Sequence, residues 1–374
     1  MATLSTEEKE EKMMEIISTS KEINDLLESQ RLSGGKTELK TGCHLIKEPV
    51  MIDTPSQRLS GEVWAYNLDP NGVFETPFGT KLKLKGMDHP AISIGITRPP
   101  AGCMVSDVGI QGDIVGMDTR GSFDPQRPYA AAGLYFGSQR VDQGDFSKIS
   151  CCGLACAVSI ADNAEIDACD FRKINTDGCC VGIYFSPRAS YYAHFSRCIA
   201  ADNPSYGFFA DGTGEKQKNI HNNDITDINF VRNCGANHLD DVNCAVYLKN
   251  VDNCTFRDNL VDSPGVFWYY EPDETSNRNK TVYKSKAAGL VIIGNKNKVM
   301  NNVFSKSSAE SVNIKGDGNI LICNIADNDV VIEGEGNVVT NLCFNSKDAR
   351  LILKGKAKNT TVISGVNQDK VINM

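Results

Sequence analysis

The sequence predicts an all-β fold, a parallel β-helix, on three observations. First, four segments near the C-terminal end share one pattern, an apolar strand followed by Gly, a turn and Asn. Second, they recur every 18 to 22 residues, a period typical of solenoids whose coils bury one inward row of side chains. Third, apolar and polar residues alternate, as they do in strands. The segments are residues 290–297, 312–319, 330–337 and 351–359.

The alternation fixes which side chains of a segment point inward. Val312 and Ile314 are expected to face the axis of the solenoid, and Asn313 and Lys315 to face water. Gly before the turn and Asn after it suit corners with a left-handed backbone, because Gly lacks Cβ and Asn tolerates that region. We therefore interpret the repeated asparagines as structural.

The same rhythm continues upstream with less regular spacing. Its apolar segments lie 24 or 25 residues apart at first, and the spacing then stretches to 38 and shortens to 18. About ten coils follow from this count, and such arrays fold as one unit. The prediction is a single β-helix domain over residues 33–374. The upstream segments are residues 133–136, 157–160, 182–185, 207–210, 245–248 and 265–268.

Residues 1–32 differ from the rest of the chain. They are rich in charge, contain no Gly or Pro, and carry apolar residues at roughly helical spacing. Ser5 and Glu8 fit a capping box at the start of a helix. A solenoid exposes its apolar interior at each end, so we expect an N-terminal helix that caps the first coil. The apolar residues are Met13, Met14, Ile16, Ile17, Ile23, Leu26 and Leu27.

Cysteine usage and hydropathy indicate a cytoplasmic protein without disulfides. The chain has 14 cysteines, with no hydrophobic leader after Met1 and no apolar run long enough to span a bilayer. Seven cysteines lie between Cys151 and Cys198, but no CxxC pair occurs there. That spacing predicts stacks of small buried side chains and no metal site.

The net charge of the chain limits the classes of ligand that we expect it to bind. The net charge of −8 disfavours nucleic acid and anionic membranes, so a neutral or weakly polar substrate fits better. No Gly-rich turn stands between a strand and a long helix, so neither a phosphate-binding loop nor a dinucleotide cofactor is expected.

Carboxylates and aromatic rings on the outside of a solenoid are typical of sugar binding. Rings stack on sugar C–H faces, and carboxylates bind hydroxyls and supply acid and base. Alternation places about half of each aromatic run inside. Five aspartates on neighbouring coils are candidates for one column on a single face: Asp167, Asp170, Asp177, Asp202 and Asp211. The expected substrate-binding residues are Tyr184, Tyr192, Arg188, His194, Trp268, His238 and Asp240.

Two excursions interrupt the regular coils. Residues 237–241 place His238 beside two aspartates, which suits either a general base with an orienting partner or an ordinary solvated loop. The charged stretch 271–286 is a candidate lid, a subunit contact or an exposed loop.

The order of these motifs resembles the inulin fructotransferase and difructose-anhydride hydrolase family. The likeness covers most of the chain and rests on residues 23–27, 157–170, 179–181 and 289–297. It implies a right-handed parallel β-helix, the solenoid also found in pectate lyases, and assembly as a homotrimer. It also implies cleavage or intramolecular transfer at fructosyl linkages, and a cytoplasmic location favours degradation of a small imported oligosaccharide.

The resemblance also implies catalytic residues. The family uses an Asp on one coil and a Glu on the next, and the Asp matches Asp170, whereas the position of the Glu falls on Gly182 or Tyr184. We expect Asp170 to act in catalysis, with Asp177 and Asp211 as partners. One carboxyl group protonates the departing oxygen while a second group activates the attacking hydroxyl or water.

Two other classes remain open. A polysaccharide lyase or epimerase would use the same scaffold but needs cations or calcium to bind uronates, for which Arg172, Arg188 and Arg197 are candidates. A non-catalytic carbohydrate-binding β-helix would keep the aromatic residues without carboxylates that converge in one pocket.

Overall fold

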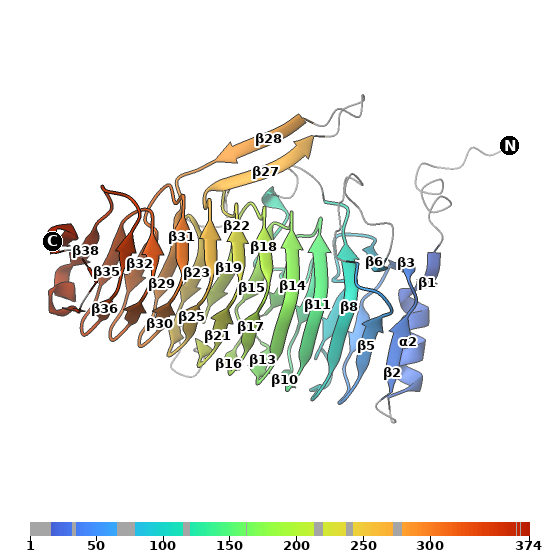
Figure 1. Cartoon of the computed structure of the whole chain (residues 1–374). Helices are drawn as coiled ribbons and strands as arrows, with labels where there is room; N and C mark the ends of the chain where they lie inside the picture. The colour runs from blue at the N-terminus through green and yellow to red at the C-terminus, as the bar shows by residue number, and fades with distance from the viewer. Residues whose placement is uncertain are drawn as a thin grey trace.

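The protein is a parallel β-helix, as the repeats predict (Figure 1). The computed structural model describes residues 16–31, 35–65, 79–114, 120–161, 163–212, 220–236, 242–271, 279–363, 365–366 and 368–374. Successive coils stack along one axis from the N-terminal to the C-terminal end (Figure 1). Within the described residues every strand pairing in the solenoid is parallel, and the antiparallel pairing belongs to a hairpin outside it.

Three sheets run along the solenoid. Sheet 1 has 12 strands, and sheet 2 has five. The strands of sheet 1 are β4 (Val50–Ile52), β7 (Ile92–Ile94), β9 (Ala132–Phe136), β12 (Cys156–Ile160), β15 (Val181–Phe185), β19 (Tyr206–Asp211), β23 (Cys244–Lys249), β29 (Ala288–Ile293), β32 (Val312–Lys315), β35 (Val330–Glu333), β38 (Leu351–Lys354) and β40 (Val371–Asn373). Those of sheet 2 are β10 (Arg140–Asp142), β13 (Glu165–Asp167), β16 (Ala189–Tyr191), β20 (Ile220–His221) and β24 (Val251–Asp252).

Sheet 3 has 21 strands and is bent into two arms, which we call arm 3a and arm 3b. The strands β8 (Met104–Gln111), β11 (Asp145–Cys152) and β14 (Asp170–Asp177) run through both arms. Arm 3a also holds β2 (Lys36–Leu39), β5 (Arg58–Gly61), β17 (His194–Ser196), β21 (Asp224–Thr226), β25 (Thr255–Arg257), β30 (Lys298–Met300), β33 (Ile320–Ile322), β36 (Val338–Thr340) and β39 (Thr361–Val362). Arm 3b also holds β1 (Ile16–Thr19), β3 (Gly42–Ile46), β6 (Thr80–Leu84), β18 (Ile199–Ala201), β22 (Asn229–Val231), β26 (Leu260–Asp262), β31 (Val303–Ser305), β34 (Ile325–Ala326) and β37 (Cys343–Phe344).

One residue per coil makes the bend between the arms. This residue has a left-handed backbone, with φ of 53° at Lys148 and 54° at both Lys173 and Arg197. We call the aligned positions the bend column. Its described members are Asp107, Lys148, Lys173, Arg197, Asp227, Asp258, Asn301, Cys323 and Asn341.

Buried asparagines follow the bends of the later coils and tie neighbouring coils together. Asn259 Nδ2 donates to Asn302 Oδ1 at 3.1 Å, and Asn302 Nδ2 donates to Asn324 Oδ1 at 3.0 Å. A second row of this kind joins Asn297 and Asn319. The repeated Asn is structural, as predicted, but for a different reason. The left-handed residue is the one before it, Lys296, Gly318 or Gly336, and the Asn side chain forms hydrogen bonds between coils.

The core lies inside the coils, in the predicted phase. Val312 and Ile314 are buried, whereas Lys315 is exposed. Phenylalanines stack from coil to coil, with ring centroids 5.1 Å apart for Phe146 and Phe171 and 4.6 Å apart for Phe171 and Phe195. All fourteen cysteines are free, and all but Cys43, Cys323 and Cys343 are buried.

The N-terminal helix is shorter than the sequence suggests. Helix α2 (Ser20–Ser29) begins after Thr19, whose backbone N–H donates to Glu22 Oε2 at 2.6 Å. It packs on the first coils through buried Ile23 and Leu27 and covers their end (Figure 1). The residues before Ser20 were expected to be helical, but Ile16–Thr19 form β1, because they pair with β3. The Ser5 and Glu8 pair lies outside the described residues.

One segment assigned to a coil lies outside the solenoid. Residues 266–268 belong to β27 (Val266–Glu271), which pairs antiparallel with β28 (Asn279–Lys284), so the excursion after Glu271 contains a strand. The repeat pattern misassigned this segment because a hairpin strand with one buried face, here that of Phe267, alternates just as a coil strand does. At the C-terminal end, the 3₁₀ helices η2 (Gly355–Asn359) and η3 (Gln368–Lys370) flank the last strands. No described helix is long and apolar enough to span a membrane.

Candidate functional site

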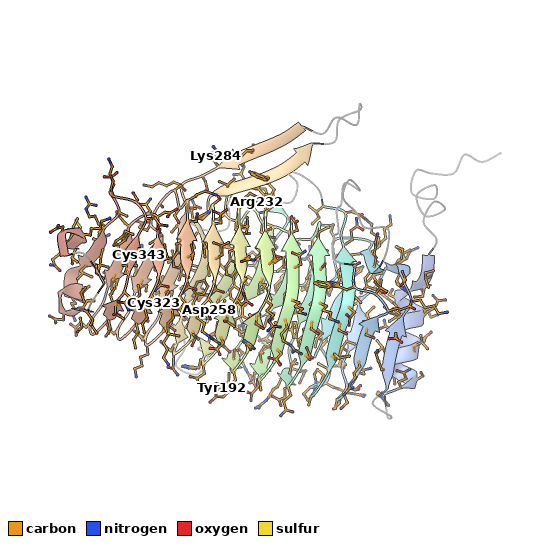
Figure 2. All side chains as sticks on the ribbon, viewed as in Figure 1. Tyr192, Arg232, Asp258, Lys284, Cys323 and Cys343 are labelled. Atoms are coloured by element: carbon orange, nitrogen blue, oxygen red, sulfur yellow. The ribbon has the colours of Figure 1, made fainter. Side chains whose placement is uncertain are left out.

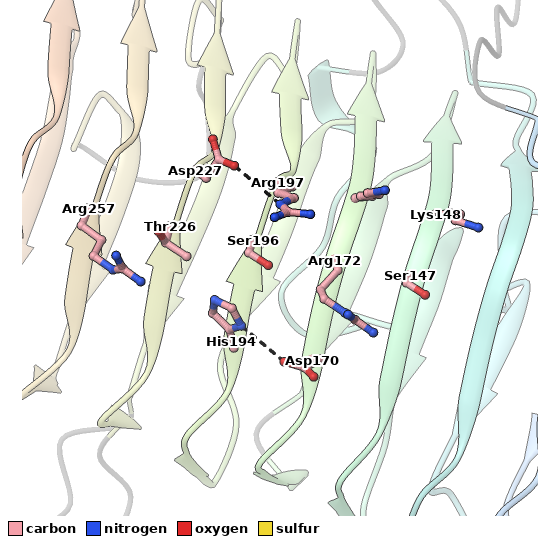
Figure 3. Close-up of a pocket in the computed structure, with 11 residues that line it drawn as sticks. Ser147, Lys148, Asp170, Arg172, His194, Ser196, Arg197, Thr226, Asp227 and Arg257 are labelled. Atoms are coloured by element: carbon pink, nitrogen blue, oxygen red, sulfur yellow. Dashed lines mark hydrogen bonds and ion pairs between the residues drawn. The ribbon is translucent and has the colours of Figure 1, made fainter.

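An open groove of about 600 Å³ runs along the outer surface of arm 3a and its bend (Figure 3). Polar and charged side chains from successive coils line it. They are Ser147, Lys148, Asp170, Arg172, Lys173, His194, Ser196, Arg197, Thr226, Asp227 and Arg257.

Strand register arranges these residues in columns. In arm 3a, the strands beside the groove start with an outward residue, continue with an inward Phe or Ile and then have a second outward residue, as in Asp170, Phe171 and Arg172. Inward Phe146, Phe171 and Phe195 therefore fix the phase of the outward positions around them. The starting column is Asp145, Asp170, His194 and Asp224, and the ending column is Ser147, Arg172, Ser196, Thr226 and Arg257.

Asp170 and His194 meet at the groove. They occupy the same register position on neighbouring coils, and His194 Nδ1 lies 3.3 Å from Asp170 Oδ1. The tautomer with a proton on Nδ1 donates a hydrogen bond to the carboxylate. Both side chains are partly exposed, at 37% for His194 and 47% for Asp170, so a ligand in the groove has access to them.

Asp145 lies on the other side of Asp170, in register with it. Its Oδ2 accepts a hydrogen bond from Arg172 at 2.6 Å. Its Oδ1 is buried and has no hydrogen-bond partner among the described residues. The carboxylate is therefore held in place through one oxygen only.

The bend column supplies most of the cations of the groove. Lys148, Lys173 and Arg197 occupy it on three successive coils. A left-handed backbone costs residues other than Gly about 1–2 kcal/mol, and Asn and Asp visit it more readily than Lys or Arg. These three residues are therefore less suited to the bend than Asp107, Asp227, Asp258 and Asn301, which surround them in the column.

The five predicted aspartates do not form one column. Asp167 belongs to sheet 2 and pairs with Arg140 at 2.6 Å, while Asp202 pairs with Arg232, with 2.8 Å between Oδ1 and Nε. The prediction was wrong because each of these coils passes through sheet 1, sheet 2, arm 3a and arm 3b, so residues a few positions apart face different directions.

The expected catalytic partners of Asp170 also lie elsewhere. Asp177 ends the same strand on arm 3b. The pKa of Arg232 is raised mainly by the hydrogen bond that its guanidinium donates to Asp202, and the charge of Asp177 makes a smaller contribution. Asp211 ends β19 in sheet 1, and its Oδ2 lies 2.8 Å from Lys249 Nζ. Neither lines the groove.

The predicted binding residues are scattered. Tyr184 is buried in sheet 1, where it stacks on Phe209 with centroids 5.4 Å apart, and it does not line the groove. Arg188 forms an ion pair with Glu165. Trp268 lies on hairpin strand β27, and the guanidinium carbon of Arg232 is 4.0 Å from the centroid of its ring. His238 and Asp240 lie outside the described residues.

Tyr192, unlike Tyr184, is largely exposed. It is 63% exposed and makes the bend that precedes His194, at the edge of the coil (Figure 2). Of the predicted residues, the structure thus brings Asp170 and His194 together and leaves Tyr192 open two residues away along the chain.

Sequence reasoning missed Asp145, Lys148, Lys173 and Arg257. A signal for them exists, because residues 145–148 (DFSK), 170–173 (DFRK) and 194–197 (HFSR) repeat one pattern at intervals of 25 and 24 residues. The shared Phe marks the inward position, and the residues around it form the columns of the groove.

Comparisons with known proteins support the fold. No protein-family model matches the sequence, and no curated protein matches it either. The fold is similar to that of a DFA-IIIase from Arthrobacter chlorophenolicus A6 solved without its lid in complex with GF2, with a TM-score of 0.62, 14% identity and coverage of 95% of this chain and 93% of that one. A mutant of that enzyme in complex with DFA-III matches with a TM-score of 0.55, 15% identity and coverage of 94% and 84%.

A viral protein has the same architecture. ORF18 of Geobacillus virus E2 matches with a TM-score of 0.52 and 14% identity, over 96% of this chain and 60% of that one. At such identities the similarity shows the fold of the chain and leaves its activity to the chemistry of the site.

Proposed function

We propose that this protein is a carbohydrate-active enzyme that cleaves or rearranges glycosidic linkages in the groove on arm 3a. The observation that carries the proposal is the pair Asp170 and His194, which line an open polar groove in register on neighbouring coils. Asp145 stands in register with Asp170 on the preceding coil. Acid and base groups beside exposed hydrogen-bonding side chains are what glycoside chemistry requires.

The spacing of the row suggests roles for its members. Parallel strands lie about 4.8 Å apart, close to the separation of about 5–5.5 Å between the carboxyl groups of retaining glycosidases. We assign to Asp170 the proton transfer to the departing oxygen, with His194 as its hydrogen-bonded partner. We assign to Asp145, which lies on the coil before Asp170 and is held by Arg172, electrostatic stabilisation of the positive charge that develops at the anomeric carbon.

This assignment replaces Asp177 and Asp211 as partners of Asp170. Both lie on other surfaces of the solenoid, and each is next to a cation there. Asp145 also provides a second carboxylate for a chain that has Gly182 or Tyr184 at the position of the family's Glu.

The fold neighbours suggest which sugars to test first. DFA-IIIase structures contain GF2 and DFA-III, so we propose fructo-oligosaccharides and difructose anhydrides as initial substrates, with hydrolysis or intramolecular transfer as the reaction. We further propose a cytoplasmic homotrimer. Light scattering that gives a monomer at micromolar concentration would exclude the trimer.

The test is to incubate the protein with inulin, difructose anhydrides and a panel of uronate oligosaccharides, and then to separate the products. Cleaved or rearranged oligosaccharides that disappear with Asp145→Asn support the proposal. Unsaturated uronate products that a calcium chelator abolishes would instead identify a lyase. Binding without any product would leave a carbohydrate-binding β-helix.

A further inference from the structure

We propose that the groove on arm 3a binds an acidic oligosaccharide, one whose sugars carry carboxylate or sulfate groups. This inference rests on the proposed glycosidic activity of the same groove, but it names an acidic substrate class in place of the neutral fructo-oligosaccharides proposed for the first tests. It replaces the neutral substrate that the overall charge of −8 suggested.

The charge of the groove differs from the charge of the chain. Five cationic side chains line it, against the two carboxylates Asp170 and Asp227. All five cations are at least partly exposed, so an anion in the groove meets them in solution. They are Lys148, Arg172, Lys173, Arg197 and Arg257.

The ion pairs of these cations leave N–H hydrogen-bond donors available for a ligand. Arg172 contacts Asp145 through one nitrogen, and a guanidinium carries five N–H donors. Arg197 lies 3.9 Å from Asp227, which is too long for a hydrogen bond. Lys173 has no ion pair among the described residues.

The other two cations pair with aspartates that do not line the groove. Lys148 Nζ lies 2.8 Å from Asp107, and Arg257 lies 3.3 Å from Asp258. Exposed pairs of this kind are weak, so a multivalent anion competes with them.

The backbone conformation of the bend does not require a cation at these positions. Lys148, Lys173 and Arg197 occupy left-handed bends for which Asp or Asn is better suited, and the bends before and after them have Asp or Asn. Residues held in an unfavourable conformation cluster at functional sites. The three cations are also those bend residues that, together with Asp227, line the groove.

The geometry suits a linear chain of charged sugars. Neighbouring coils are about 4.8 Å apart, so an oligosaccharide lying along the axis of the solenoid passes one bend cation per coil for three coils. Regular acidic groups along such a ligand match a regular row of cations, whereas nucleic acid would also require stacking platforms.

The experiment measures binding by titration calorimetry in the Asp170→Asn background, which separates binding from turnover. The probes are an oligogalacturonate, its neutral methyl ester, a sulfated galactan oligosaccharide and an inulin oligosaccharide. We expect one of the two acidic probes to bind at least about tenfold tighter than both neutral probes, since charge-assisted hydrogen bonds are lost with the charge. Its affinity should fall as salt is raised. The two acidic probes distinguish carboxylate from sulfate.

Substitutions to Asn provide a matched control. Lys173→Asn and Arg197→Asn place a well-suited residue in the bend, so melting should stay the same or rise while affinity for the acidic probe falls at least about tenfold. Lys296→Asn makes the same change at a left-handed bend outside the groove, where φ is 56°, and should leave affinity unchanged.

Equal affinity for the acid and its methyl ester would overturn the inference, as would equal effects of Lys173→Asn and Lys296→Asn. Turnover of fructans without any preference for acidic sugars would overturn it while leaving the proposed function intact. Tight salt-dependent binding of an acidic probe that the wild-type protein never converts would support the inference and contradict the catalytic proposal.

Discussion

His194 Nδ1 lies 3.3 Å from Asp170 Oδ1, across two neighbouring coils and at the edge of an open groove. Replacing Asp170 with Asn keeps the shape of the side chain but removes its ability to exchange a proton. We expect turnover of the accepted oligosaccharide to fall at least about a hundredfold, the low end for loss of a general acid or base. The free energy of unfolding, followed by thermal melting, should change by no more than about 0.5 kcal/mol.

The matched control for Asp170→Asn is Asp167→Asn. Asp167 lies three residues earlier, in sheet 2, and pairs with Arg140 outside the groove. Its replacement should leave turnover unchanged. A folded Asp170→Asn protein with full activity would remove the groove as the site of catalysis.

The alternation of β32 makes a stability prediction. Ile314 is buried and Lys315, its neighbour in the strand, is exposed. Ile314→Asp places an unpaired charge in the core, which costs several kcal/mol, and should unfold the C-terminal coils. Lys315→Asp should alter the melting temperature by little. Thermal unfolding followed by circular dichroism compares the two, and equal melting temperatures would contradict the assigned phase.

The asparagine row gives a second stability prediction. Asn302 accepts from the backbone N–H and from Nδ2 of Asn259, and it donates to Asn324. Asn302→Ala leaves several buried polar groups without partners, at about 1–3 kcal/mol each. We expect a loss of several kcal/mol in denaturant unfolding. Asn295 is exposed, so Asn295→Ala is the control. An equal loss of stability in that variant would show that the buried asparagine row stabilises the fold no more than an exposed Asn does.

Burial also controls the chemistry of the thiols. Burial raises the pKa of Cys103, Cys169, Cys198 and Cys254 to about 12. The folded protein should therefore expose Cys323 and Cys343 to a thiol reagent at pH 8 and protect the buried cysteines. These two lie on the last coils (Figure 2). Rapid modification of the buried thiols without unfolding would contradict the packing.

The raised thiol pKa values also predict a loss of stability in alkali. In the unfolded chain these thiols ionise near their usual value of 9.0, whereas in the folded protein they stay protonated to about 12. The folded state then binds more protons, so stability is full below pH 9 and falls as the pH rises toward 12. Melting temperatures between pH 8 and pH 11 check this. A flat profile would mean that these thiols ionise alike in both states.

Sequence periodicity predicted the coils because the inward rows must be apolar, and Gly and Asn recur at the turns of the later coils. It placed Val312 and Ile314 inside and Lys315 outside, as observed. It misplaced residues 266–268, because an external hairpin alternates as a coil strand does.

The site was harder to predict than the fold. Proximity in a solenoid depends on register between coils, not on proximity in sequence. Asp177 is seven residues from Asp170 but lies on another arm, whereas His194 is one coil away and makes contact. Insertions change the coil length, so the register of Asp145 and Asp170 becomes clear only when the shared inward Phe is aligned.

The bend column separates the requirements of folding from those of recognition. A bend residue needs a left-handed backbone and has an outward side chain, while the inward rows on both sides of it hold the coil together. Descendants of this chain can therefore diverge in substrate range by exchanging single bend residues, one coil at a time, without compensating changes in the interior. Selection can act on each coil almost independently, so a new specificity requires few mutations and no refolding of the scaffold.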